Sequence, residues 1–255
     1  MTSTELAHTP AAATWPQRIW NVARMHVANP FPTLVLPWVI TGIIFGINVA
    51  IWLMVATAAG GIDNVEADGL IYNGGITWIV FFMTVVAVQA MNLTFKFALG
   101  FSVTRRDFYL GSVLYFIVLS LLYSTATVAL VLVERATNGW GMSAAFFAPL
   151  GLNSTPIATL WFLYLMVLLL FFFLGAAVAT VWVRWAAYGL YAFFIALAIV
   201  LVGAGWIVTA TDSWALVGEF FTGTSLVGLA LWTAPLTLAC GVIGYLILRR
   251  ATPRS

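Results

Sequence analysis

Arg105, Arg106 and Asp107 stand side by side in a chain that carries very few charges. Only 7% of the residues are charged, and the stretches on both sides of this triplet are long and apolar. Thr104 is suited to cap a helix that begins here, and Asp107 completes a pattern like a capping box. Because the first turn of a helix already carries partial positive charge, two arginines there are electrostatically unfavourable. The segment predicts a helix start at which the arginines have a role other than helix stability.

Two interpretations of the arginine pair fit the residues. In the first, the pair anchors a loop between two membrane spans on the cytoplasmic side, for which any cationic side chain suffices. In the second, the loop docks on a partner protein, because the planar fork of arginine pairs with carboxylates and carbonyls in a fixed geometry that lysine lacks.

The absence of certain polar residues from the apolar stretches is also informative. The two histidines, His8 and His26, both precede the long apolar stretches, so a Ser–His protease site at membrane depth is excluded. The sequence contains no cluster of Cys, His or carboxylate residues with metal-ligand spacing and no phosphate-binding loop. The apolar stretches also lack the buried acids of ion-coupled transporters. We therefore expect no enzyme, metal or cofactor site in this chain.

The composition points to a membrane protein made of helices. The chain has 255 residues, of which 63% are hydrophobic. Soluble domains contain about 25% charged residues, and β-barrels show alternating rather than continuous apolar runs. A net charge of +2 is too small to indicate a nucleic-acid partner. The expected fold class is an all-α integral membrane protein in contact with the lipid bilayer.

The apolar stretches divide into six segments long enough to cross a bilayer as helices. We predict spans at about 33–58, 76–99, 108–133, 157–183, 186–209 and 225–248. The stretch from 157 to 210 is too long for one span and contains one charge, Arg184, so it is divided there. These spans make up a membrane domain at 30–250. A disordered tail at 1–13 and the helix at 14–29 precede it, and a short tail at 251–255 follows it.

The segment at 14–29 has the pattern of an amphipathic helix. Thr14 with Gln17 forms a capping box, and Pro16 suits the first helical turn. Its apolar face consists of Trp15, Ile19, Val22 and His26. The pattern favours a helix on the membrane surface, and a simple lead-in to the first span is the alternative.

The basic residues predict the orientation of the chain. With six spans, one side receives Arg18, Arg24, Lys96, Arg105, Arg106, Arg184, Arg249, Arg250 and Arg254. The other side receives Arg135 with the acids Asp63, Glu66, Asp68, Glu134, Asp212 and Glu219. Because basic residues favour the cytoplasmic side, we expect a multi-pass protein of the cell membrane with both termini in the cytoplasm.

The layout resembles a known family. Residues typical of a coupling segment between the second and third spans are Gly100, Ser102, Thr104, Arg105, Arg106 and Gly111, with Asp107 among them. Together with the span layout, they resemble the permease subunits of ABC transporters of the type-2 exporter class. The resemblance implies a short coupling helix in this segment, a separate ABC ATPase that holds ATP and Mg, a second permease chain, and export by alternating access. The amino-terminal helix and the turn at 176–189 resemble an interfacial helix and a short cytoplasmic connection of that family.

Several features leave alternatives open. Gly42 and Gly46 in the first span, with Gly203 and Gly205 in the fifth, suit either a dimer face or packing within one subunit. The external stretches 136–156 and 210–224 are either surface loops or pieces that fold back over the bundle. Instead of a transport subunit, the chain could be a membrane scaffold or assembly subunit, or an intramembrane enzyme with unrecognised residues.

Overall fold

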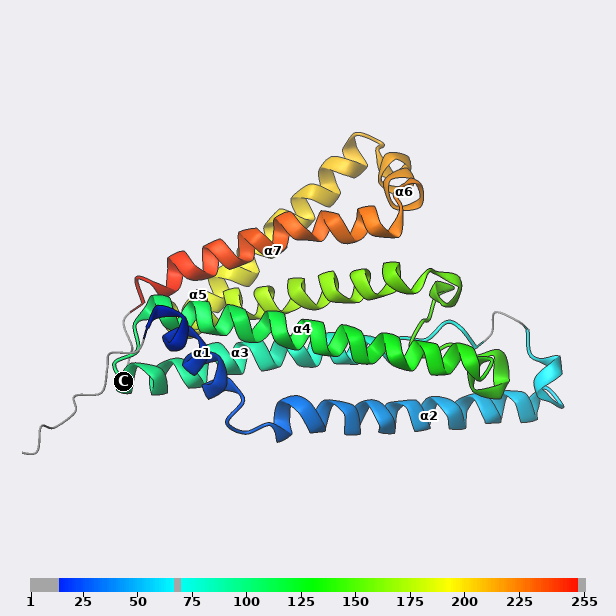
Figure 1. Cartoon of the computed structure of the whole chain (residues 1–255). Coiled ribbons are helices and arrows are strands. Elements are labelled where there is room, and N and C mark those ends of the chain that lie inside the picture. The colour runs from blue at the N-terminus through cyan, green and yellow to red at the C-terminus, as the bar shows by residue number, and fades with distance from the viewer. Residues whose placement is uncertain (1–13, 67–69, 252–255) are drawn as a thin grey trace, which may run out of the picture.

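The computed structural model describes residues 14–66 and 70–251, which form helices joined by turns (Figure 1). The helices are α1 (Trp15–His26), α2 (Leu36–Ala58), α3 (Thr77–Gly100), α4 (Arg105–Ala136), α5 (Ile157–Ala210), α6 (Trp214–Gly223) and α7 (Leu226–Leu248). Short helical turns lie at Phe31–Val35, Ile62–Asn64, Gly139–Ser143 and Leu152–Ser154. The predicted disordered tail at 1–13, the end of the chain at 252–255 and the acid Asp68 lie outside the described residues.

Five helices are long and apolar enough to cross a membrane: α2 together with the turn before it, α3, α4, α5 and α7. Their ends lie within about three residues of the predicted span boundaries, because a continuous apolar run is a strong signal for a membrane helix. The structure is therefore that of an all-helical protein with several membrane-compatible helices.

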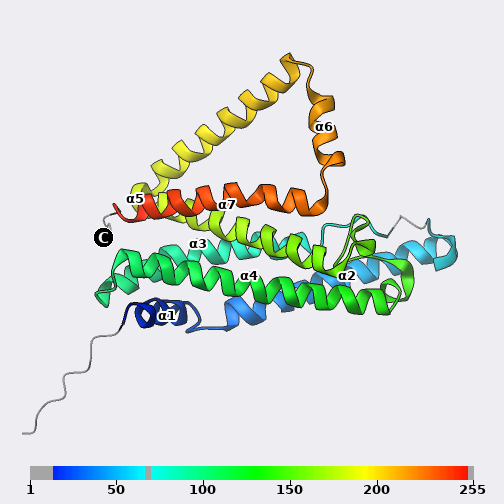
Figure 2. The same ribbon diagram turned by 45° about the horizontal axis from the view of Figure 1, so that its top comes forward.

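The longest helix, α5, changes direction within its length. Its 54 residues amount to about 81 Å of helix at 1.5 Å per residue, far more than the ~30 Å of a bilayer core. At Ala186 the backbone leaves the helical region, with φ 55° and ψ −145°. Figure 2 shows the helix as two arms that meet at an acute angle. The change of direction lies two residues after Arg184, where the sequence predicts a division.

The centre of the bundle is formed by α3, α4 and the first arm of α5. Large side chains from all three helices are fully buried there, namely Met83, Phe95, Phe108, Phe116, Tyr123 and Phe172. The backbones of α3 and α5 approach closely at Gly175, where an added Cβ would lie 2.6 Å from the backbone oxygen of Thr84. This glycine therefore determines how closely the two helices pack.

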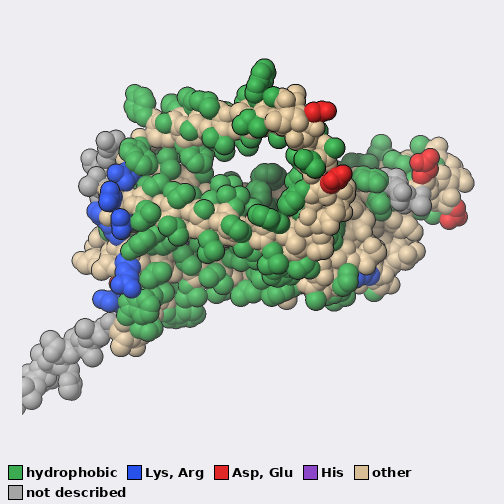
Figure 3. Space-filling view, turned by 90° about the horizontal axis from the view of Figure 1, so that it is seen from above, with side chains coloured by type: hydrophobic (Ala, Val, Ile, Leu, Met, Phe, Trp, Pro, Cys, Tyr) green, Lys and Arg blue, Asp and Glu red, His purple; other side chains and the backbone are tan. Residues whose placement is uncertain are grey.

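The second arm of α5, residues 187–210, is here called the outer arm. Most of its large side chains are exposed, and Tyr188 and Trp206 have 84% and 74% of their surface accessible. Helix α6 then leads back to α7, and Phe220 of α6 packs edge-on against Trp232, with ring centroids 5.8 Å apart. Figure 3 shows an open space between the outer arm and the rest of the molecule.

The stretch between α4 and α5 folds back onto the bundle, one of the two arrangements that the sequence allows. The Phe146 ring is fully buried and lies 5.3 Å from the ring of Phe45 in α2. The Leu150 backbone N–H donates to the Ile71 carbonyl oxygen at 3.0 Å. This stretch therefore closes the end of the bundle that lies opposite α1. In the other stretch that the sequence predicts to be external, 210–224, the chain forms the short helix α6.

Candidate functional site

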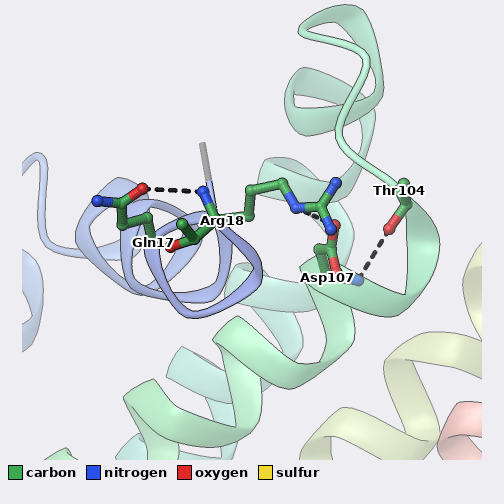
Figure 4. Close-up of polar contacts among 5 residues, drawn as sticks. Gln17, Arg18, Thr104 and Asp107 are labelled. Carbon is green, nitrogen blue, oxygen red and sulfur yellow. Dashed lines mark hydrogen bonds and ion pairs between the residues drawn. The ribbon is translucent and has the colours of Figure 1, made fainter. Parts of the chain in front are cut away.

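The predicted helix start at Thr104 is confirmed. The Thr104 hydroxyl accepts a hydrogen bond from the Asp107 backbone N–H at 3.1 Å, and α4 begins at Arg105 (Figure 4). The second half of the expected capping box is replaced by a different contact. The Asp107 carboxylate pairs with the Arg18 guanidinium of α1, Oδ2 to Nε, at 3.4 Å. Sequence spacing identified the cap but could not reveal a partner 89 residues away in the chain.

The connection between α3 and α4 is a turn, whereas the family resemblance implied a short separate helix. The turn consists of residues 101–104. Ser102 takes the left-handed conformation with φ 60°, and the Val103 N–H donates to the Ala98 carbonyl oxygen at 3.2 Å, the pattern that commonly ends a helix. Gly100, the first residue of the predicted coupling segment, is the last residue of α3. Phe101 stands out from the turn with 66% of its surface exposed.

Helix α1 is seated directly on α4. Asp107 retains only 3% exposure, and the contact continues at Gly111. A Cβ at Gly111 would lie 2.5 Å from the Cβ of Val22 and 2.9 Å from the backbone oxygen of Ile19. The glycine that the sequence analysis assigned to the coupling segment therefore allows α1 to lie against α4.

The predicted apolar face of α1 packs partly on protein. Val22 and His26 are buried against α4, whereas Trp15 is 46% exposed and Ile19 is half-buried. The capping box at the start of α1 is present, since the Gln17 side chain accepts from the Thr14 N–H at 2.8 Å (Figure 4). The periodicity identified the face correctly, but α4 covers the part of it that was expected to meet the membrane.

His26 is held in a closed environment between α1 and α4. Its Nε2 lies 2.9 Å from the Ser112 hydroxyl, and its ring stacks on Tyr115 with centroids 5.0 Å apart. Nδ1 is buried without a hydrogen-bond partner. Burial lowers the pKa of His26 to about 4, because a charged imidazolium would lose its hydration. The imidazole is therefore neutral at pH 7.

The two arginines at the start of α4 have different neighbours. Arg105 donates through Nη1 to the backbone oxygen of Arg249 at 3.0 Å, which connects α4 to the end of α7. The Arg106 guanidinium lies over the Trp15 ring, 5.6 Å from its centroid. Within the described residues neither arginine has a carboxylate partner. The sequence treats them as equivalent, but among the described residues Arg105 alone of the two makes a hydrogen bond.

Charges separate between the two ends of the molecule. Figure 3 shows Lys and Arg side chains gathered at the end where α1 lies, and most Asp and Glu side chains at the other. The first end is here called the basic end. Contacts place Arg18, Arg105 and Arg249 there. These three arginines stand against one described carboxylate in contact with them, Asp107, so their combined charge is positive.

The four glycines of the predicted dimer face lie in open surroundings. Among the described residues, no atom outside the backbone of the glycine's own helix turn lies within 4 Å of a Cβ placed on Gly42, Gly46, Gly203 or Gly205. They therefore do not serve close packing inside the subunit. The α2 pair and the outer-arm pair lie on opposite sides of the bundle (Figure 1), so one subunit cannot present all four as a single patch.

Glu134 is an organised residue that the sequence analysis counted simply as an external acid. Its side chain is fully buried at the end of α4. Oε2 accepts from the Trp140 indole N–H at 3.0 Å and from the Phe146 backbone N–H at 2.8 Å. Further backbone N–H groups of Phe147 and Ala148 donate to the same carboxylate. An acid near the carboxyl end of a helix is as unfavourable as arginines at its start, and that signal could have identified it.

The described residues contain no group of His, Cys, Asp and Glu that could hold a metal ion. No family model, curated protein or solved structure matches the chain. The basic end, where polar contacts join α4 to α1 and to α7, is the part of the predicted site that the structure holds together.

Proposed function

We propose that the chain is the permease subunit of an ATP-driven ABC transporter of the type-2 exporter class, with the basic end as its docking surface for a separate ATPase. One observation carries the proposal. The exposed turn at residues 101–104 leads directly into a helix start that is tied to two other helices, because Asp107 pairs with Arg18 of α1 and Arg105 bonds to the end of α7. Because the start of α4 is tied to α1 and α7, a displacement of the turn is passed on to those two helices.

The mechanism follows from these two contacts. An ATPase that changes shape on binding and hydrolysing ATP displaces the turn, and Arg18 and Arg249 pass the displacement to α1 and α7. Because α4 is a single helix from Arg105 to Ala136, the movement reaches the opposite end of the bundle. ATP and Mg belong to the partner ATPase, and the chain supplies a path that opens alternately to the two sides.

The proposal includes six spans and a cytoplasmic basic end. It treats the two arms of α5 as separate spans because each is long enough to cross the ~30 Å core on its own. The charge separation then follows the preference of basic residues for the cytoplasm. Reporter fusions after Ser255 and within residues 60–72 should report cytoplasm and exterior respectively. Both reporters on one side would contradict the six-span arrangement.

A second permease chain completes the proposed complex. The open glycines at 42 and 46, and those at 203 and 205, are suited to close contact with another helix. The alternatives are a scaffold subunit or an unrecognised intramembrane enzyme. Neither accounts for a fixed, exposed turn at the basic end together with spans that lack ion-coupling acids.

The test is to isolate the chain with its natural partners from solubilised membranes. We expect a soluble ATPase in equal amount. Phe101→Ser, which removes the exposed ring of the turn, should release that ATPase. The matched control is Tyr72→Ser, because Tyr72 has 68% exposure against 66% for Phe101 and lies beyond the other end of α3. Isolation without an ATPase, or equal retention by both variants, would contradict the proposal.

A further inference from the structure

A groove of about 720 Å³ runs along the outside of the bundle between α4, α5 and α7. Its walls are apolar and include Leu110, Val113 and Ile117 of α4, Phe173 of α5 and Val242 of α7. Arg106 lies at one end of the groove. The volume falls within the ~300–1,000 Å³ of small-molecule sites.

The base of the groove is held by specific contacts. The Tyr109 hydroxyl of α4 donates to the Gly241 backbone oxygen of α7 at 2.5 Å. A Cβ at Gly241 would lie 3.1 Å from the Phe173 ring, so any larger residue would press into the wall. The groove is therefore a defined feature of the packing between three helices.

The length of the groove matches one leaflet of a bilayer. From Arg106 to Ile117 the α4 helix rises about 16 Å at 1.5 Å per residue. Half of a hydrocarbon core of ~30 Å is ~15 Å. With the arginine at the basic end and the apolar wall extending toward the middle of the bundle, the groove has the dimensions of a lipid chain below its headgroup.

The walls of the groove suit the chain of a lipid. They are lined almost entirely by apolar side chains along the whole length of the groove, which are the surroundings that an acyl chain has within one leaflet.

The charge at the end of the groove indicates the headgroup. Arg106 has no carboxylate partner among the described residues, and its guanidinium is exposed beside the Trp15 ring. Cationic side chains form charge-assisted hydrogen bonds with phosphate oxygens, and basic pockets between membrane helices bind anionic lipid headgroups. A zwitterionic headgroup would leave less net attraction at this position.

We propose that this groove binds an anionic phospholipid of the leaflet at the basic end, with one acyl chain along α4 and the phosphate at Arg106. The site belongs to this chain alone and does not depend on an ATPase partner. Binding of the lipid would place a negative charge beside the turn at residues 101–104 and fill the space between α4 and α7.

The test is native mass spectrometry of the delipidated chain in detergent, titrated with dioleoyl phosphatidylglycerol or dioleoyl phosphatidylcholine. We expect phosphatidylglycerol to bind at least about tenfold more tightly. Arg106→Gln should remove that preference, because one charged hydrogen-bonded contact corresponds to about tenfold in affinity. Arg250→Gln, an exposed arginine at the same end outside the groove, should leave the preference unchanged.

A second pair of variants tests the apolar wall. Val113→Trp fills the groove and should lower phosphatidylglycerol binding at least about fivefold, whereas Val133→Trp, at an exposed position of the same helix, should not. Equal binding of the two lipids, or equal effects of Arg106→Gln and Arg250→Gln, would overturn the proposal. Arg106→Lys keeps the positive charge and should keep the preference for phosphatidylglycerol. The docking of an ATPase, by contrast, is proposed to need the planar fork of arginine.

Discussion

The first arm of α5, within the central bundle, and the outer arm have nearly the same apolar composition but opposite packing. In the bundle, Gly175 brings α5 against α3 so closely that a single added carbon would overlap the Thr84 backbone oxygen. In the outer arm, Gly203 and Gly205 face open space. Because lipid is as apolar as leucine, composition does not distinguish a helix that packs on protein from one that packs on lipid. Close backbone contacts and polar connections between helices show which helix packs on protein.

The same comparison explains how the basic end differs from the arm. The basic end is connected by Arg18 to Asp107 and by Arg105 to the backbone of Arg249. The polar bonds of the outer arm are local, such as Thr209 to the Gly205 carbonyl oxygen at 2.8 Å. Movement of the turn at residues 101–104 should therefore reach α1 and α7 directly, while the arm follows through its chain connections at Ala186 and at α6.

The largest expected effect comes from enlarging the two kinds of glycine. Gly175→Leu should lower the free energy of unfolding by at least about 3 kcal/mol, because the side chain must push α3 and α5 apart. Gly203→Leu should change it by less than about 0.5 kcal/mol, because the position is open. Thermal unfolding of both variants in detergent is the measurement, and equal losses would show that the arm is packed as tightly as the bundle.

The next effect concerns the closed end of the bundle. Glu134→Gln replaces one acceptor oxygen with an NH₂ group that faces the N–H donors around it, and should cost about 2–3 kcal/mol. Asp63→Asn, at an exposed acid of the same end, should be nearly neutral. Denaturation of the two variants should be followed together with proteolysis of residues 139–154. If both variants unfold like the unchanged protein, the Glu134 carboxylate does not hold that segment.

A smaller effect should appear as a pH dependence of stability. His26 has a folded pKa of about 4 against 6.5 when unfolded, so the unfolded chain takes up the proton first as pH falls. Stability should therefore decrease from pH 6.5 toward pH 4, by up to about 1.4 kcal/mol per pH unit. In His26→Phe this part of the slope should be absent, while the titration of carboxylates remains. Equal slopes for both proteins would exclude a buried neutral histidine.

Sequence information was sufficient where the signal is local. Apolar runs located the long helices, the lone charge at Arg184 marked the change of direction at Ala186, and Thr104 was identified as a cap. Such features depend on residues within one or two turns of each other.

The features that the sequence did not predict depend on distant partners. The Asp107 carboxylate was expected to bond within its own turn but pairs with Arg18. Ser102, which is not a glycine, takes the left-handed conformation in the turn before α4. The groove beside Arg106 needs three separate helices to come together, and Glu134 bonds groups 6 to 14 residues further along the chain. Spacing along one helix contains no information on which helix lies opposite.

The central claim is that the turn at residues 101–104, with Arg105 and Arg106 beside it, docks an ATPase through geometry rather than through charge alone. Arg249 contributes only its backbone oxygen to the contact with Arg105, which a lysine at that position keeps. The most direct measurement is ATP hydrolysis by the isolated complex in lipid vesicles, for Arg105→Lys with Arg106→Lys, and for the control Arg249→Lys with Arg250→Lys. Both double variants keep every positive charge, so insertion and orientation should be unchanged. In the first double variant, the ATP hydrolysis that the permease stimulates should fall at least about tenfold, because lysine cannot form arginine's planar contacts. In the control it should stay unchanged. Full activity in the first pair would contradict the account and leave these arginines as membrane anchors.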